Sequence, residues 1–181
     1  MKKTIFLVCG RTATGKSSIV HKVCDETDLS YVKSYTTRPM RDSEKEESDH
    51  LFISPEDVDL YKDKMAAYTK IGDYEYFTTF DVLDKADFYV IDPKGIAELR
   101  MRCKGRYNIK VIYIRVPKDQ LLKRARKRGD DAKRAANRIS AEDEEFTEFE
   151  KFEGWDYHIL NTGTFQDAVE KMKRILRKEG V

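Results

Sequence analysis

GRTATGKS, from Gly10 to Ser17, is the stretch that decides the fold of this chain. It follows the apolar run IFLVC (5–9) and precedes a helical pattern, so it matches G-x-x-x-x-G-K-[ST] in a strand-to-helix context. Glycine at both ends lets the backbone curl until its N–H groups point inward at a phosphate, and the helix N-terminus adds positive potential there. A mere strand-to-helix turn rarely carries this spacing. The motif therefore predicts a site for a nucleoside triphosphate.

Individual residues of the motif have distinct expected tasks. Lys16 is expected to reach the β and γ oxygens, and the hydroxyl of Ser17 to ligate Mg²⁺. Asp92 ends the apolar run FYVID (88–92) and is a candidate carboxylate near the metal, although an Asp before Pro93 also suits a helix cap. The triphosphate-binding candidates in the motif are Gly10, Thr12, Ala13, Thr14, Gly15, Lys16, Ser17 and Ser18.

Apolar runs of strand length alternate with segments of helical spacing along most of the chain. The runs are IFLVC (5–9), FYVI (88–91), KVIYIRV (110–116) and YHIL (157–160), and the helical segments are 16–27, 94–104, 117–128 and 164–178. This alternation predicts an α/β fold with a parallel sheet covered by helices on both faces.

The region 35–85 does not show this alternation and is rich in Tyr, Thr and charged residues. It contains one helix start, at Ser54-Pro55. It is expected to be an inserted lobe that shapes a substrate pocket, because ligands bind beyond the carboxyl ends of parallel strands.

Composition narrows the class of protein. With 181 residues, 40% apolar and 38% charged, one compact domain with a highly charged surface is expected. The net charge of +2 gives no reason to expect a nucleic acid or a membrane as partner. Cys9, Cys24 and Cys103 lack C-x-x-C spacing, which favours a reducing compartment over disulfides or zinc. The first apolar run is too short for a signal peptide or a membrane span, so a cytoplasmic protein is expected.

The segment SYTTRPMRDSEKEESDHLFIS (34–54) resembles the guanylate kinase family pattern S-x-T-T-R-x-x-R-x-G-E-x-x-G-x-D-Y-x-F, and the resemblance extends over most of the chain. In that family both arginines grip the phosphate of the acceptor nucleotide, which assigns this role to Arg38 and Arg41. Two fork-shaped donors three residues apart suit a dianionic phosphate, which they can bind bidentately.

Two shorter motifs extend the resemblance to the acceptor site. YFT (76–78) is similar to the family's Y-G-[ST], and DPKG (92–95) to its D-x-Q-G. The resemblance implies that Tyr76 donates to the acceptor phosphate, that Ser34 and Thr78 face the base, and that Asp92 belongs to the acceptor side as well.

The basic stretches KRARKRG (123–129) and AANRIS (135–140) look like the family's lid. Carried over by position, Arg124 and Arg128 approach ATP, and Arg138 bridges the donor and acceptor phosphates and neutralises their charge. A solvated helix with i,i+4 pairs is the simpler alternative. Asn161, after the run HIL, is expected near the adenine. The implied division is a core of 1–34, 86–128 and 155–181, an acceptor-binding lobe 35–85 and a helical lid 129–154.

Three departures from the family pattern concern the acceptor. His50 replaces the Tyr that shares the acceptor phosphate, and Phe77 replaces a Gly, with an apparent one-residue insertion at Glu75. The family's acid that reads guanine should fall near Ala66 or Ala67, where no carboxylate stands. Loss of the acid that hydrogen bonds to the base should change base specificity strongly. One hypothesis is that Glu75 supplies this acid instead.

The resemblance implies a kinase that transfers the γ-phosphoryl group of Mg·ATP to a nucleoside monophosphate, with GMP or dGMP first among acceptors. A kinase for another nucleotide or for a phosphorylated sugar would keep Arg38 and Arg41 without needing base contacts. A non-catalytic binding module of the same fold is a third possibility, but such modules typically have a degraded ATP site.

Overall fold

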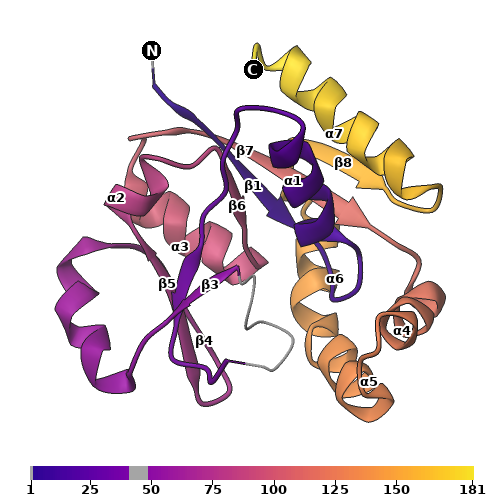
Figure 1. The fold of residues 1–181 in the computed structure, drawn as a ribbon, viewed down its shortest axis with the longest axis horizontal. Helices are drawn as coiled ribbons and strands as arrows, with labels where there is room; N and C mark the ends of the chain where they lie inside the picture. Colours follow the sequence, from indigo (N-terminus) through magenta and orange to yellow (C-terminus); the bar gives the residue numbers. More distant parts are fainter. Residues whose placement is uncertain (1, 41–48) are drawn as a thin grey trace.

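The computed structural model describes residues 2–40 and 49–181, which include two four-stranded sheets (Figure 1). The first sheet has the order β6-β1-β7-β8, and every neighbouring pair in it is parallel. Its strands are β1 (Thr4–Cys9), β6 (Phe88–Val90), β7 (Asn108–Arg115) and β8 (Tyr157–Leu160). They match the four apolar runs with small shifts at the ends, so the predicted parallel sheet is confirmed.

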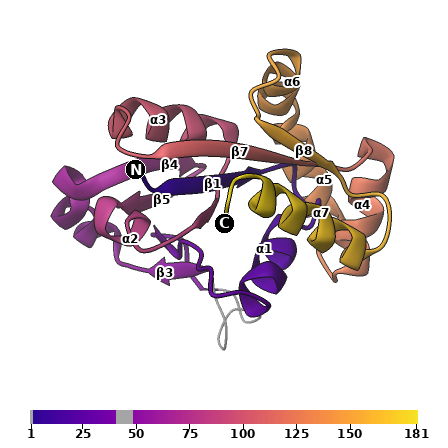
Figure 2. The ribbon, with the colours of Figure 1, turned by 90° about the horizontal axis from the view of Figure 1, so that it is seen from above.

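Helices cover both faces of this sheet, as Figure 2 shows from above. One face packs against α1 (Lys16–Asp25) and α7 (Phe165–Lys178), and the other against α3 (Pro93–Cys103) and α6 (Asp143–Lys151). The strands divide between the two cores because successive side chains point to opposite faces. In β1, for example, Phe6 and Val8 face α1 and α7, whereas Ile5, Leu7 and Cys9 face α3.

The second sheet lies in the predicted inserted lobe 35–85, except that its first strand begins one residue before this range, at Ser34. Its order is β3-β2-β5-β4, with β2 parallel to β3 and antiparallel to β5. The strands are β2 (Ser34–Thr36), β3 (His50–Phe52), β4 (Met65–Ile71) and β5 (Tyr74–Thr79). The sheet joins the core through β4, which packs against α3, and through the short helix α2 (Phe80–Leu83).

Helix η2 (Pro55–Lys64) covers one face of the second sheet. Ser54 caps it by accepting a hydrogen bond from the N–H of Glu56, so the predicted helix start is confirmed, but the helix is of the 3-10 type. Phe77 is fully buried on this face and stacks on Tyr35. The apolar side chains on this face leave the opposite face for polar residues.

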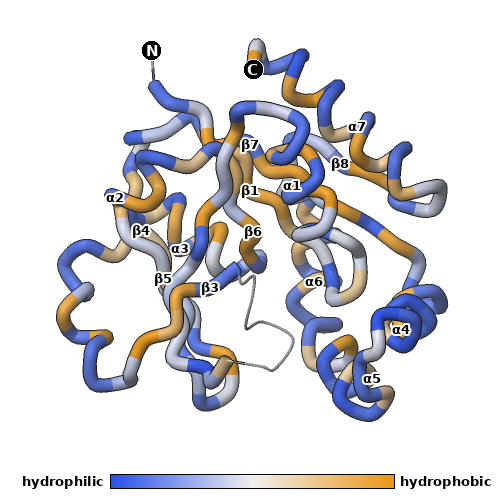
Figure 3. Tube along the Cα trace, viewed as in Figure 1, coloured by the Kyte–Doolittle hydropathy of each residue, from blue (hydrophilic) through white to orange (hydrophobic). Residues whose placement is uncertain are grey.

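Three charge-rich helices lie on the other side of the core from the second sheet (Figure 1): α4 (Lys118–Lys127), α5 (Ala132–Ala141) and α6. Figure 3 shows α4 as mostly hydrophilic, α5 as mixed, and β1 as mostly hydrophobic. The only buried residues of α4 and α5 are Leu121, Ala125 and Ala135. No helix in 2–40 or 49–181 has both the length and the apolar character needed to cross a membrane.

Candidate active site

The glycine-rich loop (10–17) connects the C-terminal end of β1 to α1. A Cβ on Gly10 would lie 2.3 Å from the carbonyl oxygen of Ile114 in the adjacent strand, so only glycine fits there. Gly15 has a φ of +91°, a left-handed conformation that glycine adopts without strain, and it opens α1 as its N-cap. Both glycines are therefore required by the backbone, as the motif predicts.

Lys16 folds back over this loop. Its ammonium donates to the carbonyl oxygen of Arg11 at 3.1 Å, and the same oxygen accepts from the hydroxyl of Thr14 at 2.7 Å. Burial lowers the pKa of Lys16 to about 8, although the negative charge of Glu142 acts in the opposite direction. The ammonium is thus a desolvated cation in a loop of backbone donors, which suits an anionic ligand.

Asp92 lies at the same edge of the sheet as the glycine-rich loop, because β6 runs parallel to β1. Its Oδ1 accepts the N–H of Gly95 at 2.6 Å and caps α3, with Pro93 in the first turn, so the expected helix cap is confirmed. Burial raises the pKa of Asp92, and its charge interacts with that of Lys16. Its role toward a metal stays a prediction.

Glu142, between α5 and α6, connects these helices to the glycine-rich loop. Its Oε2 accepts the backbone N–H of Thr12 at 2.7 Å, and its Oε1 accepts the Thr12 hydroxyl at 2.6 Å. The Nε of Arg138 donates to the same Oε1 at 3.3 Å. Through Glu142 the structure brings Arg138 beside the loop, although the side chain of Arg138 is 57% exposed.

Arg11, in the glycine-rich loop, holds α6 against the loop through ion pairs. Its Nη1 lies 2.7 Å from Asp143 Oδ1 and its Nε 3.6 Å from Glu150 Oε1, while the guanidinium lies over the ring of Phe146. The Arg11 side chain is only 3% exposed. Buried charges need such partners, so these contacts hold α6 against the loop.

Asn161 and Arg124 meet on the other side of the loop. The Nδ2 of Asn161 donates to the carbonyl of Thr14 at 2.9 Å, and the carbonyl of Asn161 accepts from Arg124 Nη2 at 2.7 Å. Arg128, in contrast, is 59% exposed and pairs with Asp130 at the end of α4. The structure thus brings Arg124 to the loop and leaves Arg128 at the surface.

Four of the predicted acceptor residues share one face of the second sheet: Ser34, His50, Tyr76 and Thr78. Ser34 pairs with His50 in the β2–β3 ladder, and their side chains hydrogen bond at 2.9 Å. The ring of Tyr76 lies edge-on to that of His50, with centroids 5.6 Å apart. Thr78 lies two residues further along β5 on the same face, because side chains alternate along a strand.

Thr78 is fully buried, and its hydroxyl has no hydrogen-bond partner among the described residues. It stands opposite Ala67 in the β4–β5 ladder, next to an irregularity between Met65 and Ala67. Ala66 and Ala67 are both buried in the apolar core. The place expected for the family's acid therefore presents only methyl groups beside Thr78.

Arg38 follows β2 and is buried, with 8% of its surface exposed. Its Nη1 donates to the carbonyl of Pro39 at 2.8 Å, and its guanidinium lies over the ring of Phe52. Phe52 pairs with Thr36 in the ladder, so Arg38 reaches the polar face of the sheet. Arg41, the second predicted phosphate ligand, lies outside the described residues.

Glu75 points to the opposite face of the sheet. Its Oε1 accepts a hydrogen bond of 2.7 Å from the hydroxyl of Tyr68, which stands opposite Phe77 and packs in the core under η2. Tyr76 and Thr78 face the other way. The structure therefore counts against the hypothesis that Glu75 supplies the missing acid.

Arg11, Glu142 and Asp49 carried no prediction. Burial would raise the pKa of Asp49, yet hydrogen bonds from His21 and Ser17 lower it overall, so Asp49 connects the glycine-rich loop with β3. The sequence signal for Asp49 is its place directly before His50, where the family pattern has an acid followed by a tyrosine. Arg11 and Glu142 act through contacts between distant segments, for which the sequence has no local signal.

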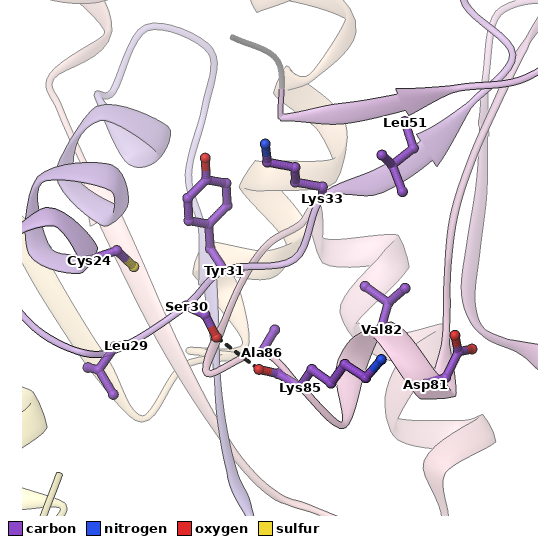
Figure 4. A pocket seen from close by; sticks show the side chains of 10 residues that line it. All are labelled: Cys24, Leu29, Ser30, Tyr31, Lys33, Leu51, Asp81, Val82, Lys85 and Ala86. Atoms are coloured by element: carbon purple, nitrogen blue, oxygen red, sulfur yellow. Dashed lines mark hydrogen bonds between the residues drawn. The ribbon is translucent and has the colours of Figure 1, made fainter.

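A cavity of about 480 Å³ lies away from these residues (Figure 4). Apolar side chains such as Leu29, Tyr31 and Val82 line it together with Lys33 and Lys85. None of the predicted site residues that the structure describes lines this cavity. The candidate site therefore rests on the glycine-rich loop and the polar sheet face.

The parallel sheet, the glycine-rich loop at the end of β1 and the basic helices beside it define the class of this protein. It is a P-loop protein with a nucleotide-binding core.

Comparison with known proteins gives the family, because a family model described as guanylate kinase matches residues 1–179. A guanylate kinase of Buchnera aphidicola subsp. Schizaphis graminum is 27% identical over 97% of this chain and 87% of its own. One of Syntrophotalea carbinolica is 29% identical over 97% and 86%. A crystal structure of guanylate kinase from Anaplasma phagocytophilum is similar in fold, with a TM-score of 0.67 and 22% identity over 98% of this chain and 86% of that chain. The chain belongs to the guanylate kinase family, a family of nucleoside monophosphate kinases, and is a phosphotransferase of that class.

Proposed function

We propose that the protein transfers the γ-phosphoryl group of ATP to GMP or dGMP and forms ADP and the nucleoside diphosphate. One observation carries most weight: contacts of the glycine-rich loop link it to Arg124 and Arg138, through Asn161 and Glu142, and to the polar sheet face, through Asp49 beside His50. Phosphoryl transfer needs little beyond such positioning and charge. A cytoplasmic location, where both nucleotides are available, belongs to the same proposal.

In this proposal the loop residues and Lys16 bind the β and γ phosphates, while Arg124, Arg128 and Arg138 stabilise charge on the transferring group. Ser17 and Asp92 would hold Mg²⁺, since a hydroxyl and a carboxylate are the oxygen donors that this ion prefers. Asp92 uses only one oxygen for its helix cap, which leaves the other for the ion or its waters. When bound, Mg²⁺ neutralises charge on the β and γ oxygens.

The acceptor phosphate is assigned to Arg38, Arg41, His50 and Tyr76, and the base to Ser34 and Thr78. The hydroxyl of Thr78, which has no partner in the part of the chain that the structure describes, supports a ligand here, because a buried hydroxyl without a partner is costly. A second candidate function follows from Ala66 and Ala67: without the acid, another nucleotide or a phosphorylated sugar is the acceptor.

The test is an assay of ADP release from Mg·ATP with a panel of GMP, dGMP, AMP, CMP, UMP, dTMP and ribose phosphates, against an acceptor-free control. Strong stimulation by GMP or dGMP alone is the expected result. Stimulation by another acceptor alone would transfer the assignment to that acceptor. If none of them stimulates ADP release while ATP still binds, the catalytic proposal is wrong and the binding module takes its place.

A further inference from the structure

A carboxylate of the protein itself occupies the glycine-rich loop. Glu142 accepts both the N–H and the hydroxyl of Thr12, at 2.7 and 2.6 Å, with its two oxygens. Arg138 donates to the same carboxylate. Backbone N–H groups of this loop type are anion ligands, so Glu142 makes the contacts of an anionic ligand.

The position of these contacts along the loop identifies the phosphate that they imitate. The inner phosphates of a bound nucleotide lie at the N-terminus of the helix, which here begins at Lys16. The ammonium of Lys16, which serves the β and γ phosphates, lies at the carbonyl of Arg11, one residue before Thr12. Thr12 and Glu142 are therefore at the outer end of the loop, where the terminal phosphate belongs.

We propose that Glu142 is a built-in competitor of the terminal phosphate of ATP. It holds Thr12 and Arg138 while ATP is absent, and ATP binds by displacing it. This inference rests on the proposed function, because it takes ATP as the donor and Arg138 as a ligand of its phosphates. ADP lacks the terminal phosphate and so binds without displacing Glu142, which makes Glu142 a residue that weakens ATP relative to ADP.

The displacement needs only a movement of the Glu142 side chain. Asp143, the next residue, is held by the buried guanidinium of Arg11 and also lies 2.5 Å from Lys118. These ion pairs keep α6 in place. The Glu142 side chain is 20% exposed and can swing toward solvent, which frees the guanidinium of Arg138 for phosphate.

The experiment compares two substitutions by isothermal titration with ADP and with a non-hydrolysable ATP analogue, both with Mg²⁺. Glu142→Gln keeps the size and removes the charge, and Glu142→Asp keeps the charge and shortens the reach. If the contact forms in about nine of ten molecules, it lowers the apparent ATP affinity about tenfold, so both variants should bind the analogue about tenfold more tightly. Affinity for ADP should stay the same.

Glu144→Gln is the matched control, because it removes the same charge from an exposed position of α6. It should leave both affinities unchanged, and circular dichroism should show every variant folded. Unchanged affinities in both Glu142 variants would overturn the proposal. So would equal tightening of ADP and the analogue by Glu142→Gln with none by Glu142→Asp, since that pattern reflects charge alone. A wild-type protein that binds neither nucleotide would overturn the proposed function instead.

Discussion

The two sides of the candidate site differ in how far they are held together before any ligand binds. On the glycine-rich loop, Thr12, Thr14 and Lys16 all have hydrogen-bond partners, supplied by the loop itself, by Glu142 and by Asn161. On the polar sheet face, Ser34 and His50 bond to each other, but the buried hydroxyl of Thr78 has no partner among the described residues. The comparison teaches that internal hydrogen bonds hold the triphosphate side together, whereas the acceptor side has one buried hydroxyl, that of Thr78, without a partner among the described residues.

The largest effect is expected on the triphosphate side. Lys16→Ala should lower turnover by about a thousandfold or more, because a preorganised charge is lost where negative charge develops. The fold should persist, since the Lys16 ammonium makes a single hydrogen bond to the loop. Steady-state kinetics measures the turnover, and circular dichroism shows whether the fold persists. Lys22→Ala, a change at a partly exposed lysine in the last turn of the same helix, should retain activity. A folded Lys16→Ala protein with most of its turnover would refute the catalytic assignment.

The same side should respond to pH. Because the pKa of Lys16 is about 8 in the free protein, its ammonium loses its proton as the pH rises through this value. An anionic triphosphate favours the charged form, so ATP affinity should fall above about pH 8 and binding should take up a proton there. Titration calorimetry in buffers of different ionisation enthalpy detects this uptake. It should be absent in Lys16→Met, and its persistence in that variant would assign it to another group.

Thr78→Val tests the acceptor side with a smaller expected effect. Removing an unpartnered buried hydroxyl while keeping its shape should leave stability unchanged or raise it by up to about 1 kcal/mol. The KM for the acceptor should rise about tenfold if the hydroxyl binds the base. Thr79→Val is the matched control, because its hydroxyl is also buried and has no partner within 2–40 and 49–181, one residue along β5 and on the other face. An equal change in KM for both variants would remove Thr78 from the site.

The smallest effect is expected for Glu75→Gln. Glu75 bonds to Tyr68 on the face turned away from Tyr76, so kcat/KM for the acceptor should stay within about twofold of wild type. Thermal unfolding should show a loss of about 1 kcal/mol or less from the weakened hydrogen bond, and Tyr68→Phe should lose a similar amount. A large fall in acceptor kcat/KM would restore Glu75 as the acid that reads the base.

The fold was predictable because its signals are local. Four apolar runs and the spacing of the intervening helices specified the parallel sheet, and the loop motif specified the turn at Gly10 and Gly15. The second sheet was harder to predict, since its strands are short and mixed in polarity. Its parallel β2–β3 pair and antiparallel β5 depend on contacts between residues far apart in the chain.

The candidate site also has features that follow from local sequence and features that depend on contacts between distant segments. The sequence by itself determined which residue types are present: the lysine, the arginines and the hydroxyls of the motifs, and the absence of an acid at Ala66 and Ala67. Only the tertiary structure decided that Glu142 binds Thr12 and that Glu75 faces away from Tyr76. The physical reason is that a motif fixes local backbone geometry and chemistry, whereas the partner of a side chain depends on how distant segments pack and on which face of a strand it occupies.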